Sequence, residues 1–470
     1  MISLSETIFF TMNKILTVSK ILPRGFSTAK SCYAVCYPKP DYGPMEVQRS
    51  ELMNGIRVAA AKPGGSYMAA CTIMFQAGSR YEIDDQIGAN HFLRATASCT
   101  GCAYTAYAKN RHLQQQGASL TCSSDRQTIS FTLRCPPTCY PDLKYYLLDA
   151  ATRCCFAPWE IDDRKTLIKE DLQRIPPEQR VMDLLQQAMW AGPLSNSIFC
   201  VEERIDAMTD DALNCFVKTN FRTDVCTVAS IGVPFEETLK LAEKIESRRE
   251  RPSPRCEMIS CARGGFEFHD LGRCSDTWIA LGITGCGTCD ISTLIKYSII
   301  AAACGVGNVS MGQHAMDNTP QPPLGMMVGA DPYTEYRAFN ISYSNTGIFG
   351  LLAKAHAGLA SSVAVAAAEF LANVGDLTFK QIDIGKKRLI MNMTLNEDNC
   401  ILSSESLALQ LANNVHLDNC GISIGLIDST SNDDICCLAK KIAAMSPCMA
   451  VAVVGDVGAV PHDRFLVCGT

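Results

Sequence analysis

The chain is poor in charge. Of its 470 residues only 19% are charged, whereas about 25% is usual for a globular protein. The 42 basic and 48 acidic residues leave a formal charge of −6. A balance this mild argues against a protein whose main task is to coat nucleic acid or anionic lipid. Hydrophobic residues make up 47% of the chain, which is enough for sizeable cores and excludes disorder over most of its length.

The sequence also lacks an apolar run long enough to cross a bilayer. The longest candidate, residues 348–375, is interrupted by Lys354, His356 and Glu369, and its alanine-rich spacing predicts an amphipathic core helix. The apolar stretch 451–460 is about half as long as the roughly 20 residues that a spanning helix needs. We therefore expect a soluble or peripheral protein.

Cofactor motifs are missing as well. The sequence has neither a Cys-x-x-Cys-His haem-attachment motif nor an intact glycine-rich phosphate loop. We therefore expect no cofactor.

Cysteine, in contrast, is abundant, with 25 residues scattered along the chain. Cys99 with Cys102, and Cys286 with Cys289, have the Cys-x-x-Cys spacing of redox motifs and of half a zinc site. A chain this rich in cysteine also produces such spacings by chance. We expect most of the thiols to be buried and reduced, packing as small hydrophobic groups.

The first 30 residues are basic and rich in hydroxyl groups, with one acid, Glu6. This composition predicts a mitochondrial transit peptide, which together with a flexible start we assign to residues 1–35, with cleavage near Phe26. Residence in the matrix would also keep the thiols reduced. The basic residues of the segment are Lys14, Lys20, Arg24 and Lys30.

The chain contains an internal duplication. Residues 205–218 recur as 427–440 at a constant offset, and both copies run into a strand-like stretch that ends in glycine. Upstream, residues 159–162 match 380–383 at nearly the same offset, and Phe131 matches Phe339 at a shorter one. The duplication predicts two homologous domains.

Strand and helix patterns are mixed within each copy. Residues 127–133 alternate as a strand does, and residues 210–219 form an amphipathic stretch with Thr209 as a plausible N-cap. We predict an α+β protein in which each domain is an antiparallel-type sheet covered by helices. The domains span 36–246 and 264–470, joined by a charged, proline-bearing linker over 247–263. The expected core tryptophans are Trp159, Trp190 and Trp278.

A recognisable motif lies in the first copy, where residues 75–82 (FQAGSRYE) are followed by residues 88–95 (GANHFLRA). This pattern resembles the two-domain zinc peptidases of the pitrilysin/insulinase family, in which an inverted His-x-x-Glu-His motif lies on a helix after such a segment. In that family two histidines one turn apart bind zinc, the glutamate activates water, and a distant glutamate is the third protein ligand.

This sequence retains only the first position of the motif, as His91. Arg94 stands at the position of the general base and Ala95 at that of the second histidine. A guanidinium cannot take a proton from water and would repel a zinc ion. The region of the distal ligand offers Glu170, Asp171 and Glu178, but they have no site to complete. We expect a degenerate zinc motif, with no bound metal, no catalytic residue and no enzymatic activity.

Three segments narrow the resemblance to one branch of the family, the core 2 subunits of the mitochondrial cytochrome bc1 complex. They are residues 91–98, 117–121 and 339–350, the last interpreted as strand, turn and helix, and the likeness runs from about Val47 to the carboxyl end. It implies a structural subunit of ubiquinol–cytochrome c reductase (respiratory complex III), peripheral on the matrix side of the inner membrane. The implied partners are core protein 1, cytochrome b, cytochrome c1 and the iron–sulfur subunit, in a dimeric complex without nucleic acid.

Two alternatives belong to other functional classes. The non-catalytic α subunit of mitochondrial processing peptidase binds presequences and has a long glycine-rich loop in its second half. The corresponding residues 303–312 contain three glycines among bulkier residues, which argues against this alternative. An active metalloprotease would need glutamate and histidine in place of Arg94 and Ala95.

Overall fold

The computed structural model describes residues 46–61, 68–245, 259–308, 322–328, 333–415, 417 and 420–462. The expected transit peptide lies outside these ranges, as do most of the predicted linker and much of the 303–312 loop. The described residues all belong to one compact unit.

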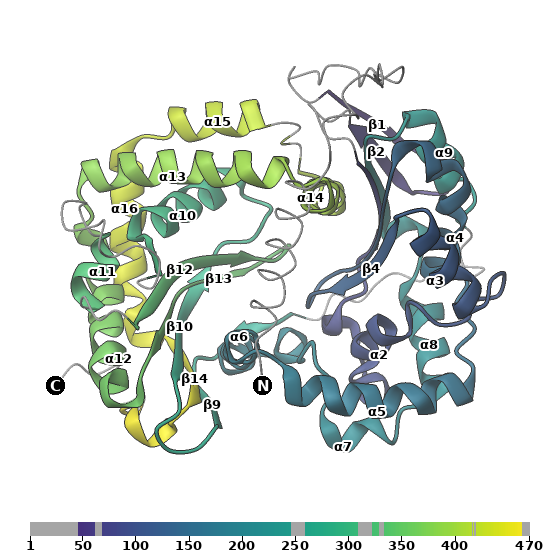
Figure 1. Ribbon diagram of the computed structural model, residues 1–470. Coiled ribbons are helices and arrows are strands. Elements are labelled where there is room, and N and C mark those ends of the chain that lie inside the picture. The colour runs from purple at the N-terminus through teal and green to yellow at the C-terminus, as the bar shows by residue number, and fades with distance from the viewer. Residues whose placement is uncertain are drawn as a thin grey trace, which may run out of the picture. The chain divides into compact units, whose positions relative to one another are not determined.

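The first half of the chain builds a six-stranded sheet (Figure 1). Neighbouring strands pair antiparallel, except that β2 and β7 are parallel. In spatial order the strands are β1 (Val47–Glu51), β2 (Arg57–Ala61), β7 (Cys226–Ile231), β3 (Ala69–Phe75), β5 (Ile129–Cys135) and β4 (Ser119–Ser124).

The second half builds another six-stranded sheet with the same internal order. Its run β9-β14-β10-β13-β12 repeats β2-β7-β3-β5-β4, including one parallel pair at the same place. The two homologous α+β domains predicted from the sequence are therefore confirmed, each sheet being antiparallel apart from one pair. The strands are β11 (Val306–Asn308), β12 (Glu335–Ser342), β13 (Gly347–Ala355), β10 (Thr277–Gly285), β14 (Ala450–Gly455) and β9 (Phe266–Asp270).

The helices repeat in the same way: α5, α6 and α8 correspond in chain order to α13, α14 and α16. Thr209 caps α8 as predicted, since its side chain accepts a hydrogen bond from Ala212 N at 3.3 Å. In the first half the helices are α2 (Ala89–Thr96), α3 (Ala106–Gln115), α4 (Tyr140–Thr152), α5 (Pro158–Arg174), α6 (Pro177–Met189), α7 (Glu202–Ile205), α8 (Asp210–Asn220) and α9 (Phe235–Ala242). In the second half they are α10 (Ile291–Cys304), α11 (Pro323–Val328), α12 (Ala357–Ala372), α13 (Phe379–Glu397), α14 (Cys400–Ala412), α15 (Cys420–Ser429) and α16 (Asn432–Ala444).

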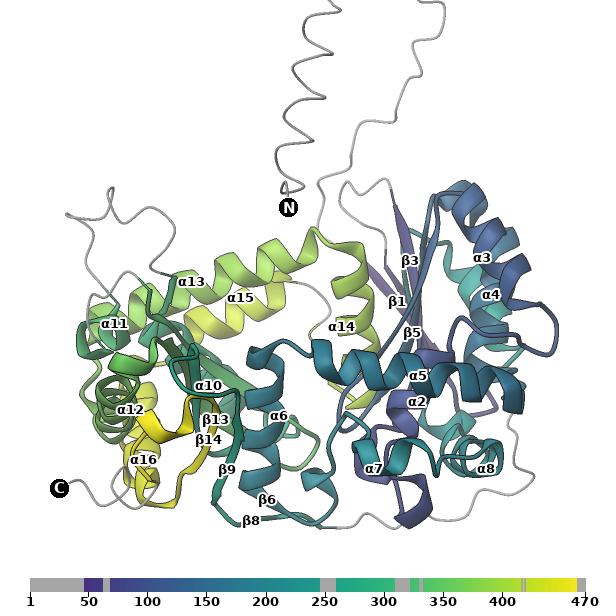
Figure 2. The same ribbon diagram turned by 60° about the horizontal axis from the view of Figure 1, so that its bottom comes forward.

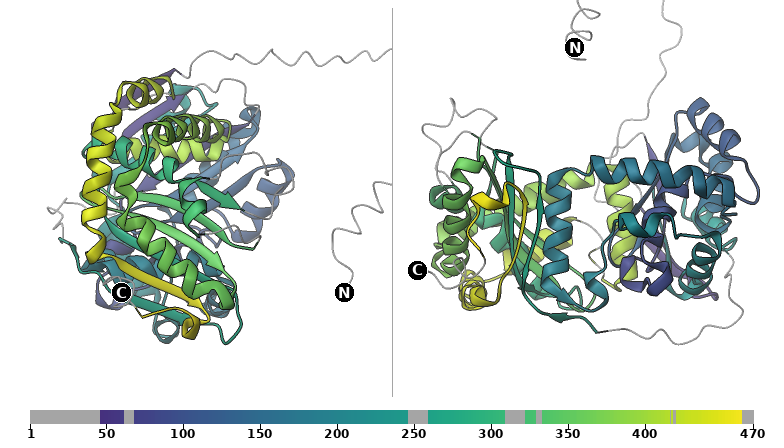
Figure 3. Two further views of the ribbon diagram at one scale, coloured as in Figure 1. Left: turned by 90° about the vertical axis from the view of Figure 1, so that its left-hand side faces the viewer. Right: turned by 90° about the horizontal axis from the view of Figure 1, so that it is seen from below.

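Two helices are exchanged between the halves. Helix α6 packs on the second sheet, where Leu185 and Met189 meet Ala280 and Ala452 in one buried cluster. Helix α14 packs on the first sheet, with Leu407 among the buried residues of the matching cluster. Figure 2 shows each helix beside the strands of the other half, and the right-hand view of Figure 3 shows α6 and α12 on opposite faces of the second sheet. Each sheet thus buries its second face under a helix contributed by the other half.

The exchange is also held by hydrogen bonds. The hydroxyls of Thr72 on β3 and Ser404 on α14 lie 2.8 Å apart and are both fully buried. A second set of hydrogen bonds joins the two halves: Gln127 donates to Ser344 Oγ at 2.5 Å and accepts from Ser344 N at 3.1 Å. The turn between β12 and β13 is thereby fixed to the turn between β4 and β5.

Three expectations about secondary structure and strand correspondence were wrong. Residues 339–350 form a strand, a turn and a second strand, so the expected 348–375 helix is strand β13 followed by α12. Phe131 lies in β5 whereas Phe339 lies in β12, the counterpart of β4. The two strands of a hairpin share the same alternation of inward and outward side chains. The sequence match therefore selected β12 in place of its hairpin partner β13, the true counterpart of β5.

The tryptophans differ from one another in burial. Trp190 is 1% exposed, as predicted, and Trp278 is half-buried. Trp159, in contrast, is 71% exposed, because it lies in the first turn of α5 with its side chain toward solvent. Among the described residues no helix is both long and apolar enough to cross a membrane.

Candidate functional site

Helix α2, which carries the degenerate motif, is anchored at its N-terminus by a carboxylate. The Glu82 side chain accepts hydrogen bonds from Gly88 N at 2.8 Å, Asn90 N at 2.7 Å and Asn90 Nδ2 at 3.0 Å. A negative group at this end accepts hydrogen bonds from unpaired backbone N–H groups and interacts favourably with the helix dipole. Gly88 has φ of 96°, and a Cβ there would lie 2.4 Å from Cys200 Sγ, so the turn into the helix requires glycine.

Burial nevertheless dominates the chemistry of Glu82, which is 4% exposed. Burial raises the pKa of its carboxyl group to about 7, while the hydrogen bonds from Gly88 and Asn90 and the charge of Arg94 oppose the rise. At neutral pH this carboxyl group is therefore divided between its two protonation states.

His91 is held as a neutral imidazole. Its side chain is 6% exposed, and its Nδ1 accepts a hydrogen bond from Cys200 N at 3.2 Å. Burial, followed by the nearby charge of Arg94, lowers the pKa of the ring to about 4. Because Nδ1 accepts, the ring proton lies on Nε2, so neither nitrogen offers a lone pair to a metal ion.

Arg94 fills the position of the general base with a guanidinium that has two contacts in the segment covering α2. It donates to the carbonyl oxygen of Ile198 at 2.8 Å, and its Cζ lies 5.5 Å from the centre of the Phe199 ring. Burial lowers the pKa of Arg94, but nearby acidic groups that include Asp183 and Glu82 oppose this effect. Ala95, at the second histidine position, packs against the hydrophobic core of the first half.

Two residues of the expected distal-ligand region form ion pairs elsewhere. Glu170 pairs with Arg174 at 3.3 Å, and Glu178 pairs with Arg337 of the second half. Asp171 is one of the acidic groups whose charge reaches Arg94. In the part of the chain that the structure describes, no group of three or more His, Cys, Asp or Glu side chains is arranged to hold a metal ion. The residues at this site do not fit a zinc ion.

A buried ion pair that the sequence analysis missed supports the segment covering α2. Arg126 donates to Asp183 Oδ1 at 2.7 Å, and the two side chains are 2% and 6% exposed. Asp183 Oδ2 accepts from Ser197 Oγ at 2.7 Å, just before the residues that contact Arg94 and His91. The partners are far apart in the chain, and no local spacing signals their contact.

Comparison with known proteins finds a family model that matches part of the first half of the chain. Residues 57–202 match the model of the insulinase family, peptidase family M16. This region is similar to the insulinase-type domain. The match includes α2, where the family resemblance was predicted from residues 75–95.

Several known proteins match the chain nearly from end to end. Human cytochrome b-c1 complex subunit 2 is 24% identical over 427 residues, which is 89% of this chain and 91% of the relative. The mouse subunit 2 is 22% identical over 89% of this chain and 91% of its own length. The α subunit of mitochondrial processing peptidase from Solanum tuberosum is 24% identical over 90% of this chain and 85% of its own length. The resemblance to the core 2 branch is confirmed, and the processing-peptidase branch matches at a similar identity.

Proposed function

We propose that this chain is a non-catalytic structural subunit of mitochondrial ubiquinol–cytochrome c reductase, equivalent to core protein 2. The observation that carries the non-catalytic part of the proposal is the α2 helix, with Arg94 and Ala95 in place of the base and second ligand and His91 bonded to Cys200 N. End-to-end similarity to cytochrome b-c1 complex subunit 2 supports it. In this role the chain pairs with core protein 1 and supports cytochrome b, cytochrome c1 and the iron–sulfur subunit.

The proposal also covers where in the cell the chain is located and how its domains are arranged. Residues 1–35 direct it to the mitochondrion, and residues 36–246 and 264–470 act as two peptidase-like domains around the 247–263 linker. The assembled subunit is peripheral on the matrix side of the inner membrane. The basic, acid-poor start of the sequence and the mitochondrial relatives support this assignment.

Exposed apolar side chains on the second half supply a surface for such an assembly. Ile384, Met391 and Leu395 are 43%, 57% and 59% exposed and are spaced seven and four residues apart, so they lie on one face of α13. Apolar groups gathered on a helix face are typical of surfaces that a partner covers.

The second candidate function is the presequence-binding α subunit of mitochondrial processing peptidase. The potato α subunit, which matches this chain at the same identity as human subunit 2, supports it. An inactive α2 helix is compatible with both functions, so the assembly state has to separate them.

Native electrophoresis of detergent-solubilised mitochondria tests the proposal. We expect the chain to migrate with cytochrome b and cytochrome c1 in the dimeric complex, and to leave the membrane fraction only when that complex is solubilised. Migration as a small matrix heterodimer with a zinc-containing partner would instead support the processing-peptidase function and contradict the first proposal.

Zinc content gives a second, independent prediction. After dialysis against zinc followed by a weak chelator, the purified chain should retain far less than one zinc ion per molecule, because α2 offers no free ligand pair. Elemental analysis measures the content, and the R94E/A95H double variant, which restores the family motif, is the matched comparison. Stoichiometric zinc on the wild-type chain that is lost in His91→Ala would contradict the prediction.

A further inference from the structure

Two cysteines far apart in the sequence meet at the surface of the first half. The Sγ atoms of Cys102 and Cys155 lie 3.0 Å apart, and both residues are exposed. Cys102 lies in the loop between α2 and α3, and Cys155 lies in the connection between α4 and α5. The partner that the structure gives to Cys102 is therefore Cys155, and not Cys99 of the Cys-x-x-Cys spacing.

The backbone around the pair is fixed on both sides. Cys102 N donates to the carbonyl oxygen of Arg153 at 2.8 Å, and Gly101 forms an isolated antiparallel bridge with Cys154. Ala103 N donates to Asp149 Oδ1 at 3.0 Å. A Cβ on Gly101 would lie 1.9 Å from Asp149 Oδ2, so the loop lies directly on α4. The backbone segments that carry the two thiols are therefore held together by main-chain contacts and by the Asp149 side chain.

Helix α5 and a buried ion pair also hold the loop between α2 and α3. Glu160 accepts hydrogen bonds from Thr100 N at 3.1 Å and from Thr100 Oγ1 at 2.6 Å. Lys109 pairs with Asp149 at 3.3 Å, both side chains being almost fully buried. Cys102 is thus placed between two firmly anchored positions in the loop.

The neighbouring cysteines are directed elsewhere. Cys99 is 7% exposed, and its sulfur accepts a hydrogen bond from Arg164 Nε at 3.2 Å. Cys154 donates to the carbonyl oxygen of Ala150 at 3.0 Å. Both sulfurs therefore have hydrogen-bond partners outside the exposed pair of Cys102 and Cys155.

We propose that Cys102 and Cys155 are a reversible oxidation site that forms a disulfide joining the α2–α3 loop to the α4–α5 connection. The oxidant is hydrogen peroxide. One thiolate attacks the peroxide oxygen, so that an S–O bond forms, the O–O bond breaks and hydroxide leaves as water. The second thiolate then attacks the sulfenic sulfur, forming the S–S bond and releasing a second water. The two sulfurs lose two electrons, and the peroxide gains them.

Peptide mapping of the full-length protein tests the site. The protein is fully reduced, desalted, treated over a range of protein concentrations with hydrogen peroxide at one fixed concentration, alkylated and digested with trypsin. We expect residues 95–109 linked to residues 154–164, a loss of two hydrogen atoms in intact mass, full reversal by a dithiol, and a yield that does not fall on dilution. A linkage confined to residues 95–109, or one whose yield falls on dilution, would overturn the proposal.

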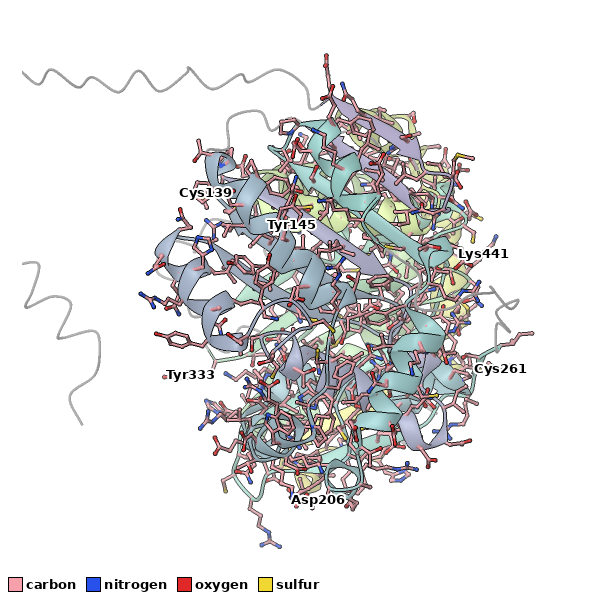
Figure 4. All side chains as sticks on the ribbon, turned by 90° about the vertical axis from the view of Figure 1, so that its right-hand side faces the viewer. Cys139, Tyr145, Asp206, Cys261, Tyr333 and Lys441 are labelled. Atoms are coloured by element: carbon pink, nitrogen blue, oxygen red, sulfur yellow. The ribbon has the colours of Figure 1, made fainter. Side chains whose placement is uncertain are left out.

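Because each of these peptides contains two cysteines, single variants identify the sulfurs. Cys99→Ser and Cys154→Ser should keep the linkage, whereas Cys102→Ser and Cys155→Ser should abolish it. Cys261→Ser is the control for an exposed cysteine elsewhere, since Cys261 lies at the edge of the molecule in Figure 4. Circular dichroism checks that each variant is folded. Survival of the linkage in folded Cys102→Ser or Cys155→Ser would refute the assignment.

Discussion

Replacing Asp183 by alanine should lower the free energy of unfolding by about 3–5 kcal/mol, because it leaves the Arg126 guanidinium charged and buried without its partner. The variant also removes the acceptor of Ser197 Oγ, which fixes the segment over α2. Urea denaturation followed by tryptophan fluorescence measures the loss, and the midpoint should fall at an unchanged slope.

An exposed ion pair in the same half provides the matched control. Asp206, 72% exposed, pairs with Lys169 at 2.8 Å and is labelled on the lower edge of Figure 4. Asp206→Ala should cost less than about 1 kcal/mol, since solvent screens the pair. Equal losses in Asp183→Ala and Asp206→Ala would show that burial of the Arg126–Asp183 pair does not stabilise the fold.

Single variants of Glu82 and His91 should have opposite pH dependences of stability. The pKa of Glu82 is raised from 4.5 to about 7, so its contribution to stability is complete below pH 4.5 and is lost as the pH rises to 7. The pKa of His91 is lowered from 6.5 to about 4, so its contribution is complete above pH 6.5 and is lost as the pH falls to 4. In the wild-type chain the two slopes largely cancel between pH 4.5 and 6.5.

Glu82→Gln should therefore lose up to about 3 kcal/mol of stability, relative to the wild type, on acidification from pH 6.5 to 4. His91→Gln should lose a similar amount, relative to the wild type, as the pH rises from 4.5 to 7. The measurement is the difference in unfolding free energy between each variant and the wild type across this range, which cancels the titration of all other groups. Parallel curves for the three proteins would contradict the prediction.

The duplication was predictable because it depends on helices whose caps and apolar faces are local in sequence. Thr209 and the aspartates after it mark α8, and Ser431 with Asp433 marks α16. The 339–350 hairpin was not predictable in this way. A short apolar run fits a strand or a buried helix equally well, and the pairing of β12 with β13 decides between them.

The motif residues of the candidate site were visible in the sequence, but their state was not. The spacing of His91, Arg94 and Ala95 is local, and this is what revealed the altered motif. The hydrogen bond from Cys200 N to His91, the burial of Glu82 and the Arg126–Asp183 pair all join residues distant in the chain. The thiol pair shows the same limit, because the spacing in the sequence relates Cys102 only to Cys99, whereas the fold brings Cys102 to Cys155.

The exchanged helices have a consequence for how the chain is made on the ribosome. Strand β7 ends at Ile231, but its cover, α14, begins at Cys400. At roughly 5–20 residues per second, the apolar face formed by β2, β3 and β7 stays uncovered for on the order of 10 s during translation. Until then Met74 and Ile231 on that face lack their helix. A chaperone that shields this surface would prevent aggregation of the nascent chain during that interval.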